Sequence, residues 1–413
     1  MYGHATIGCR KIIRVLEVFA KQIDLTIPHH TTVRQWLIRY GYHSLQKPLS
    51  IADDWISIGD LTISVGKLKC LAVLGIQNRD LQAKEDLILT HKDVHLLGLY
   101  PTEKSTGDFV EEALEDSAKR VGGNFLATIS DQGPEMKKGS NQFRHNHPTV
   151  KLMYDISHKL SNVVEHELKD DVKWSEYIQK LNLTRRRVFQ TEFAALMPKK
   201  QREKARFMDI SHLVYFPERI RKNKKNGSFR TVSEERYQDY LGWIEDFSPH
   251  IEEWGFMVGI VDLIKGTIHA YGLSAEVYLY LKIFLEEAPI EGNRLKTFIT
   301  KILDTVKVEV DKLDEGQIII CSTEVLESVF GKYKAINEGL HGITGNILGI
   351  ATFVGKEKDE NQIKEAMEKC SVKNAMIWVR QKFGKTLASL RKQFFPNQKR
   401  TKFDIEESVV FSN

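Results

Sequence analysis

The chain has 413 residues, and its 60 lysines and arginines against 55 aspartates and glutamates give a formal net charge of +5. With 42% hydrophobic and 28% charged residues, it has the composition of a folded soluble protein, which excludes a mainly disordered, collagen-like or coiled-coil architecture. No apolar run reaches the ~18 residues of a membrane span, and the four scattered cysteines form no CxxC pair, so we expect a cytoplasmic protein without structural zinc.

Residues 1–48 are predicted to form two helices. The run "CRKIIRVLEVFAKQI" repeats apolar residues at helical spacing, and "TTVRQWLIRYGY" follows after a short break. The second helix carries Arg34, Gln35 and Arg39, and the first fifty residues hold seven basic and two acidic residues, a net of +5. This layout is typical of a helix-turn-helix that contacts DNA. The alternative is a helical hairpin that packs on the next domain.

Residues 49–160 are predicted to form a mixed α/β unit. Three apolar runs rich in β-branched residues are typical of consecutive strands, namely "DWISIGDLTISVG", "KCLAVLGIQ" and "DVHLLGLYP". A helix over "STGDFVEEALEDSAKRVGGN", a strand at "FLATIS", a short helix at "KGSNQFRHNH" and a strand at "TVKLMYDISH" then follow. This order lacks the strict alternation of a doubly wound nucleotide-binding fold, and no phosphate-binding glycine motif occurs.

Three further regions complete the predicted organisation. Residues 161–310 are expected to be a mostly helical insertion, and residues 311–355 a short apolar segment followed by a helix. Residues 356–413 are expected to be a basic helical tail with a frayed end.

Basic residues gather in two of these regions as well as at the N-terminus. Thr184–Arg230 holds fourteen basic and four acidic residues, a net of +10, and it includes Arg185, Arg186 and Arg187. Lys373–Lys402 holds nine basic residues and no acidic residue. For each run a solvated surface is the alternative, but three such runs on a nearly balanced chain favour double-stranded DNA as the partner.

Three carboxylates have positions that suit metal-dependent chemistry. Asp60 lies within the strand "WISIGDLTISV", where an ionised carboxylate is costly unless it is paired or binds a metal. Asp131 ends the strand "FLATIS" before a Gln-Gly-Pro turn, which presents it at the carboxyl edge of the sheet. Glu327 lies on the polar stripe of the helix "STEVLESVFGKYK", two turns before Lys334. Three hard oxygen donors suit Mg²⁺ or Mn²⁺, and two such ions can promote a phosphoryl displacement.

With these residues the chain resembles the ribonuclease-H-like catalytic domain of bacterial insertion-sequence transposases of the DDE type. That family has a mixed five-stranded sheet, with one Asp on the first strand, one Asp after the fourth strand, and a Glu on a late helix beyond an inserted domain. The segments "IGDLTIS", "ISDQGPE" and "EVLESVFGKYK" match these places with Asp60, Asp131 and Glu327, and Lys334 completes a Glu-x6-Lys spacing.

The resemblance covers roughly residues 30–350 and implies the activity of a bacterial enzyme. It implies cleavage of element ends, strand transfer by a 3′-hydroxyl with two Mg²⁺ or Mn²⁺ ions, and a homodimer or higher multimer on DNA. Groups with Glu-x6-Lys often carry a Tyr and an Arg before the Glu, where this chain has Ile320 and Thr323, so a different subgroup is indicated.

Alternatives remain for both the residues and the activity. Glu324 lies one turn from Glu327 on the same stripe and rivals it as the third ligand. Asp155 and His158, in "YDISHK", either form a structural hydrogen bond or act beside the metals. The competing activities are a nuclease of the same fold that cuts branched DNA without joining it, and a non-catalytic DNA-binding protein derived from a transposase.

Overall fold

The structure is a computed structural model, and it describes residues 6–65, 68–201, 206–227, 232–336, 344–356, 358–384 and 393–394. Most of the basic run from residue 373 to residue 402 therefore lies outside the described residues. Among the helices of the described ranges, none combines the length and the apolar character needed to cross a membrane.

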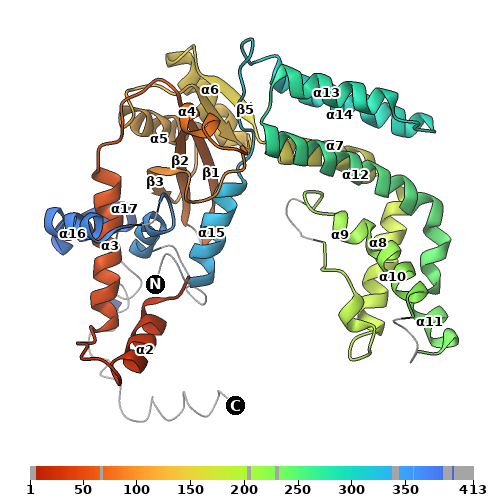
Figure 1. The fold of residues 1–413 in the computed structure, drawn as a ribbon, viewed down its shortest axis with the longest axis horizontal. Coiled ribbons are helices and arrows are strands. Elements are labelled where there is room, and N and C mark those ends of the chain that lie inside the picture. The colour runs from red at the N-terminus through yellow and green to blue at the C-terminus, as the bar shows by residue number, and fades with distance from the viewer. Residues whose placement is uncertain are drawn as a thin grey trace.

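One part of the molecule is built on a five-stranded mixed sheet, as the sequence predicts (Figure 1). Its strands are β1 (Trp55–Val65), β2 (Leu68–Gln77), β3 (His95–Thr102), β4 (Ala127–Ser130) and β5 (Lys151–Tyr154). They lie in the order β3-β2-β1-β4-β5. Strands β1, β2 and β3 pair antiparallel, whereas β4 pairs parallel with both β1 and β5. The carboxyl ends of β1, β4 and β5 therefore point in the same direction.

Both faces of the sheet are covered, because successive side chains of a strand point to opposite sides. On one face, Leu71 and Val73 pack with apolar residues of α5 (Gly107–Lys119) and α6 (Pro134–Asn146). On the other face, Ile56, Ile58 and Ile129 pack with residues of α7 (Ile156–Leu168) and α15 (Glu324–Ile336). Strands buried on both faces explain the near-continuous apolar runs in the sequence.

Local signals set the boundaries of these helices. The Thr106 hydroxyl accepts a hydrogen bond from the Phe109 N–H at 3.2 Å and caps α5. The predicted strand over "TVKLMYDISH" is too long, since β5 ends at Tyr154 and α7 starts at Ile156. Asp155 causes this change, because its side chain accepts a hydrogen bond from the His158 N–H and caps α7.

The chain between α7 and α15 is helical and forms a lobe beside the sheet (Figure 1). Its α-helices are α8 (Val172–Arg187), α9 (Ser211–Val214), α10 (Phe216–Lys225), α11 (Glu234–Leu241), α12 (Ser248–Tyr271), α13 (Ala275–Glu287) and α14 (Asn293–Val310). The described residues also form three short 3-10 helices, η1 (Ala194–Leu196), η2 (Gly242–Phe247) and η3 (Gly345–Thr352). One short α-helix, α4 (Asn78–Gln82), follows β2.

A buried carboxylate attaches this lobe to the edge of the sheet. Glu309, on α14, is 1% exposed and accepts a hydrogen bond from the Tyr154 backbone N–H at 2.9 Å. The ammonium groups of Lys159 and Lys312 lie 2.7 and 2.6 Å from its two oxygens. Because two cations and one N–H compensate the buried charge, α14 is held in a defined position against β5.

The N-terminal helices pack against the C-terminal part of the chain. Helix α3 (His30–Gln46) follows α2 (Cys9–Phe19) and contacts η3, α16 (Glu360–Lys369) and α17 (Val372–Phe383). A Cβ atom at Gly41 would overlap the backbone of Leu348, so α3 approaches η3 closely only because it has a glycine there. Residues 20–29 link α2 to α3, which is longer than the roughly three to four residues of a helix-turn-helix turn.

Candidate functional site

Asp60 and Asp131 lie on neighbouring strands. The parallel register of β1 and β4 pairs Ile56 with Ala127 and Ile58 with Ile129. Continued by two residues, this register sets Asp60 opposite Asp131, on strands that are ~4.8 Å apart. Partners in a parallel register share a face of the sheet, so both carboxylates lie on the face that α7 and α15 cover. Asp60 is 7% exposed and comes directly before a bulge in the pairing of β1 with β2.

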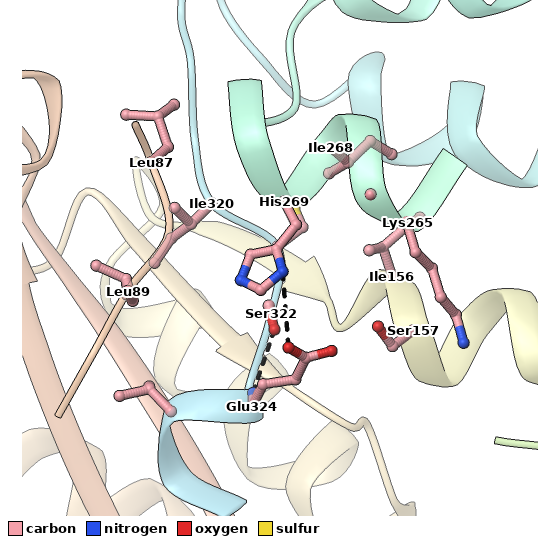
Figure 2. A pocket seen from close by; sticks show the side chains of 13 residues that line it. Leu87, Leu89, Ile156, Ser157, Lys265, Ile268, His269, Ile320, Ser322 and Glu324 are labelled. Atoms are coloured by element: carbon pink, nitrogen blue, oxygen red, sulfur yellow. Dashed lines mark hydrogen bonds and ion pairs between the residues drawn. The ribbon is translucent and has the colours of Figure 1, made fainter. Parts of the chain in front are cut away.

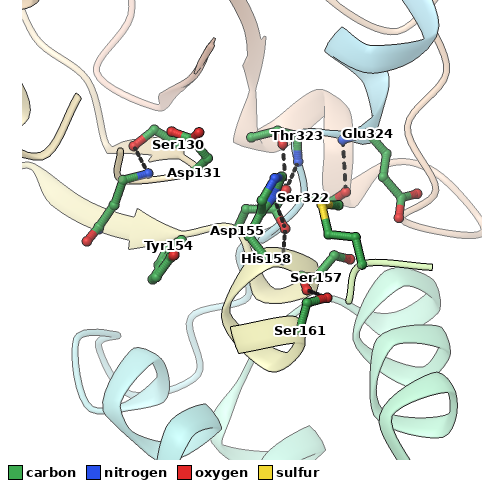
Figure 3. Close-up of polar contacts among 12 residues, drawn as sticks. Ser130, Asp131, Tyr154, Asp155, Ser157, His158, Ser161, Ser322, Thr323 and Glu324 are labelled. Carbon is green, nitrogen blue, oxygen red and sulfur yellow. Dashed lines mark hydrogen bonds and ion pairs between the residues drawn. The ribbon is translucent and has the colours of Figure 1, made fainter. Parts of the chain in front are cut away.

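The turn after β4 holds Asp131 in place (Figure 3). Asp131 Oδ1 accepts a hydrogen bond from the Gly133 N–H at 3.0 Å, and the Ser130 hydroxyl accepts one from the Gln132 N–H at 3.4 Å. Gln132 has a φ of 51°, a left-handed conformation that is unfavourable for a residue with a side chain. Helix α6 begins immediately afterwards, at Pro134. The Asp131 carboxylate is half-buried and has a defined orientation.

Asp155 occupies the equivalent place after β5, but its oxygens are used within the fold. It is 1% exposed, and its Oδ2 accepts hydrogen bonds from the backbone N–H and the hydroxyl of Thr323, each at 2.6 Å. Its Oδ1 accepts a bond from the His158 N–H at 3.0 Å. Burial would raise the pKa of Asp155, but these bonds and the His158 side chain lower it below the usual value. Asp155 thus joins the start of α7 to the start of α15.

His158 lies among the three aspartates. Its Nδ1 is 3.5 Å from Asp155 Oδ1, an ion-pair distance when the ring is protonated. Burial opposes the charged ring, yet the carboxylate of Asp155, and then the charges of Asp131 and Asp60, raise the pKa of His158 above its usual value. This shared influence is consistent with the strand register, which directs all three carboxylates toward the same region.

Helix α15 brings Glu324 and Glu327 to this side of the sheet. It packs against β1, and both glutamates are exposed. Glu324 Oε2 lies 3.7 Å from Nδ1 of His269, a residue of α12 in the helical lobe. Figure 3 shows the Glu324 carboxylate on the opposite side of the Thr323–Asp155 contact from Asp131. Glu327 is one turn further along α15 and is exposed like Glu324.

A small cavity lies between α12, the start of α7 and the start of α15. Its volume is about 80 Å³, and it is lined by Glu324 and His269, with Lys265 beside Ser157 (Figure 2). Burial lowers the pKa of Lys265, and nearby carboxylates, including Asp155 and Glu324, act in the opposite direction. Sequence reasoning did not find Lys265 or His269, because nothing in the local pattern of α12 says that it packs beside α15.

The donor set fits a hard divalent cation only in part. Asp60 and Asp131 offer carboxylate oxygens, the ligands that Mg²⁺ prefers. Within the described residues, however, no three side chains of His, Cys, Asp or Glu come close enough together to hold one metal ion. The two aspartates are the pair that the register of β1 and β4 places opposite each other.

The arginines predicted to contact DNA from α3 make contacts within the protein. Arg34 Nε donates to Oδ1 of Asn346 at 2.6 Å, and Arg39 donates to the carbonyls of Cys370, at 2.6 Å, and Met367. Gln35 is exposed. Because the two guanidinium groups join α3 to the C-terminal segments, fewer of their N–H groups face solvent than the sequence pattern suggests.

The three arginines of α8 differ in their surroundings. Arg185 donates to Asn182 at 2.6 Å, and Arg187 forms a bidentate pair with Asp239, with both distances at 2.9 Å. Arg186 is exposed and, in the ranges that the structure describes, has no ion pair or hydrogen bond. Lys334, at the end of α15, is exposed in the same way. Within the described ranges, Arg186 and Lys334 are the basic members of the predicted set that make neither a hydrogen bond nor an ion pair inside the protein.

Helix α6 carries polar residues that the sequence reading did not single out. Lys137, Ser140, Asn141 and Arg144 recur at the i, i+3, i+4, i+7 spacing of one helix face, and all four line a cavity. This spacing is visible in the sequence and could have indicated a polar face on the helix.

Comparison with known proteins gives no relative on which to base an assignment. No protein-family model matches the chain, and a search of curated proteins finds no significant similarity.

Proposed function

We propose that the chain is a DDE-type DNA transposase with a ribonuclease-H-like catalytic core, which cleaves and joins DNA by metal-dependent phosphoryl transfer. The observation that supports this most is the pair Asp60 and Asp131, set on adjacent parallel strands and on one face of the sheet. The strand order, with an antiparallel β1-β2-β3 unit beside parallel β4 and β5, is consistent with that core.

Asp60 and Asp131 would hold Mg²⁺ or Mn²⁺. Such ions are commonly bound by one or two carboxylates together with waters and substrate phosphates, so the pair suits such an ion. When bound, the ions supply activation of the attacking oxygen and stabilisation of the leaving oxygen. Glu327, on the helix that packs against β1, is the residue proposed to complete the site.

The remaining residues of the site position this pair. Asp155 fixes the starts of α7 and α15 through Thr323 and His158, and α15 carries Glu327. Lys334, two turns beyond Glu327 on the same stripe, is proposed to contact a backbone phosphate of DNA.

The test uses the full chain and DNA that carries the sequences flanking its gene. Asp60→Asn, Asp131→Asn and Glu327→Gln should abolish Mg²⁺-dependent cleavage and leave DNA binding unchanged, whereas Glu324→Gln should retain cleavage. Asp53→Asn is the matched control, since Asp53 is an exposed carboxylate in the segment before β1. Cleavage retained in all three site variants would contradict the assignment.

Two further measurements separate the competing activities. Pre-cut ends should be joined to a target duplex, and cutting without any joined product would instead support a nuclease. Calorimetric titration with Mn²⁺ should show binding that Asp60→Asn removes. An absence of both Mn²⁺ binding and cleavage would support a non-catalytic DNA-binding protein.

A further inference from the structure

A polar cavity lies beside the turn that holds Asp131. Its volume is about 140 Å³, and Leu152 of β5 contributes to its wall. Its polar lining residues are Gln132, Lys137, Ser140, Asn141, Arg144 and Lys312. Four of these come from one face of α6, one from the turn after Asp131, and one from the segment after α14.

The hydroxyl of Ser140 is buried without a partner. Ser140 is 4% exposed, and its Oγ has no hydrogen-bond partner among the described residues. A buried polar group that makes no bond is destabilising, by about 1–3 kcal/mol in typical cases, unless a ligand or water satisfies it. The position of Ser140 in the wall of the cavity indicates that the missing partner enters from there.

The charge around this hydroxyl is positive. Lys137 and Arg144 are exposed, and neither forms an ion pair or hydrogen bond within the described ranges. Lys312 is fixed by the Leu152 carbonyl at 2.8 Å and by Glu309 at 2.6 Å, so Glu309 compensates its charge. Two uncompensated cations, two amides and an unsatisfied hydroxyl are the donors that proteins use to bind phosphate oxygens.

We propose that this cavity binds a phosphodiester group of the DNA backbone, close to the strand that Asp131 would process. The proposal rests on the proposed function, because it takes the phosphate from the same DNA. Gln132 follows Asp131 directly and lines the cavity, so a phosphate held here would fix the DNA relative to the candidate catalytic carboxylates. Such a contact sets register and orientation without reading sequence.

The experiment measures binding of a short DNA duplex to the full chain without divalent metal, by fluorescence anisotropy over a range of salt concentrations. Lys137→Ala/Arg144→Ala should weaken binding about 10- to 100-fold at low salt and reduce the slope of log K against log salt by about 0.9, the value for one phosphate contact. The charge-matched control is Lys119→Ala/Lys138→Ala, since Lys119 is exposed on α5 and Lys138 pairs with Asp108 of α5 at 3.2 Å. Equal binding and equal slopes for the two double variants would overturn the proposal.

Two single substitutions keep the test independent of folding. Asn141→Glu adds a negative charge at an exposed position and should weaken DNA binding about as much as the double variant. Ser140→Ala removes the unpaired hydroxyl, so it should leave the melting temperature unchanged or raised while it weakens binding. Normal DNA affinity in both variants would contradict the proposal. It would also be contradicted if inorganic phosphate raised the melting temperature of the protein while DNA affinity stayed unchanged in every variant.

The outcome is separable from that of the catalytic assignment. Binding is measured without metal, so Asp60→Asn should bind DNA as the unsubstituted chain does. If all three site variants cleaved DNA, the proposed function would fail while the loss of affinity in Lys137→Ala/Arg144→Ala would still stand.

Discussion

The ends of β4 and β5 carry the same sequence feature, a buried strand followed by an aspartate, but the two aspartates have different surroundings. Asp155 is fully buried and accepts three hydrogen bonds from Thr323 and His158. Asp131 is half-buried and accepts one, from Gly133. A carboxylate whose oxygens are occupied by protein donors holds the fold together, whereas one with free acceptor capacity is available to a ligand.

The first test of this comparison is Asp131→Asn, which should have the largest effect of the four substitutions because it lowers the cleavage rate. The amide oxygen can still accept from the Gly133 N–H, so we expect the free energy of unfolding to change by less than about 0.5 kcal/mol. Loss of a metal-binding carboxylate should lower the cleavage rate by at least about 100-fold. Initial rates with Mg²⁺ and a urea titration measure the two effects. A large loss of stability with normal cleavage would reverse the roles given to the two aspartates.

Asp155→Asn should show the opposite behaviour. An amide cannot accept the Thr323 bonds and the His158 bond with the strength of a carboxylate, so the free energy of unfolding should fall by about 2–3 kcal/mol. The midpoint of urea unfolding measures this, with Thr323→Ser as the control that keeps both donors. An unchanged midpoint for Asp155→Asn would mean that the buried carboxylate contributes nothing to the junction of α7 and α15.

The pH dependence of stability sharpens the comparison further. The raised pKa of His158 contributes stability that is fully present below the unfolded value of about 6.5 and is lost as the pH rises through the folded value. The lowered pKa of Asp155 contributes stability that is lost only when the pH falls through its folded value, below about 3.9. The melting temperature of the unsubstituted chain should therefore fall as the pH is raised from 6 to 9. The melting temperature of His158→Gln should fall by a smaller amount over the same range. Parallel curves for the two proteins would contradict the assignment of the raised pKa.

The smallest change in the free energy of unfolding is expected for a substitution in the turn after Asp131. Gln132 has a φ of 51°, and a left-handed conformation costs a residue with a side chain about 1–2 kcal/mol. Glycine avoids this cost, but its greater flexibility in the unfolded chain cancels part of the gain in stability. Gln132→Gly should therefore raise the free energy of unfolding by up to about 1 kcal/mol, as measured by urea titration. Gln190→Gly, at a φ of 65° far from the site, is the matched control. A loss of stability in Gln132→Gly alone would show that the Gln132 side chain makes a stabilising contact.

The elements that could be predicted are those with local causes. Strand β1 follows from its β-branched apolar run, and α5 begins at the cap of Thr106 and ends before Gly122 and Gly123, whose φ values are 120° and 95°. The predicted strand β5 is too long because Asp155 lies within a largely apolar run. The cap that Asp155 forms on α7 is nevertheless also a local signal. Its hydrogen bond to Thr323, 168 residues away along the chain, has no local signal.

The positions of charges on surfaces could not be predicted in the same way. The helix-turn-helix layout and the positive charge of the first fifty residues predict Arg39 as a DNA contact, but a pattern within one helix does not reveal what packs against it. The C-terminal segment at Cys370 accepts its hydrogen bond instead. Arg186 and Lys334 have the same kind of signal as Arg39 but stay exposed, because no other element covers them in the described ranges.

The amino-acid sequence by itself determined the mixed sheet, the helical lobe and the choice of Asp60 and Asp131, because hydrophobic period and strand ends are encoded within a few residues of each position. Only the tertiary structure decided that these two aspartates face one side of the sheet, that Asp155 is occupied by Thr323, and that Ser140 opens into a cationic cavity. Those facts depend on the pairing of β1 with β4 and on the packing of α15 and α6. Contacts between distant segments have no signature in either segment alone.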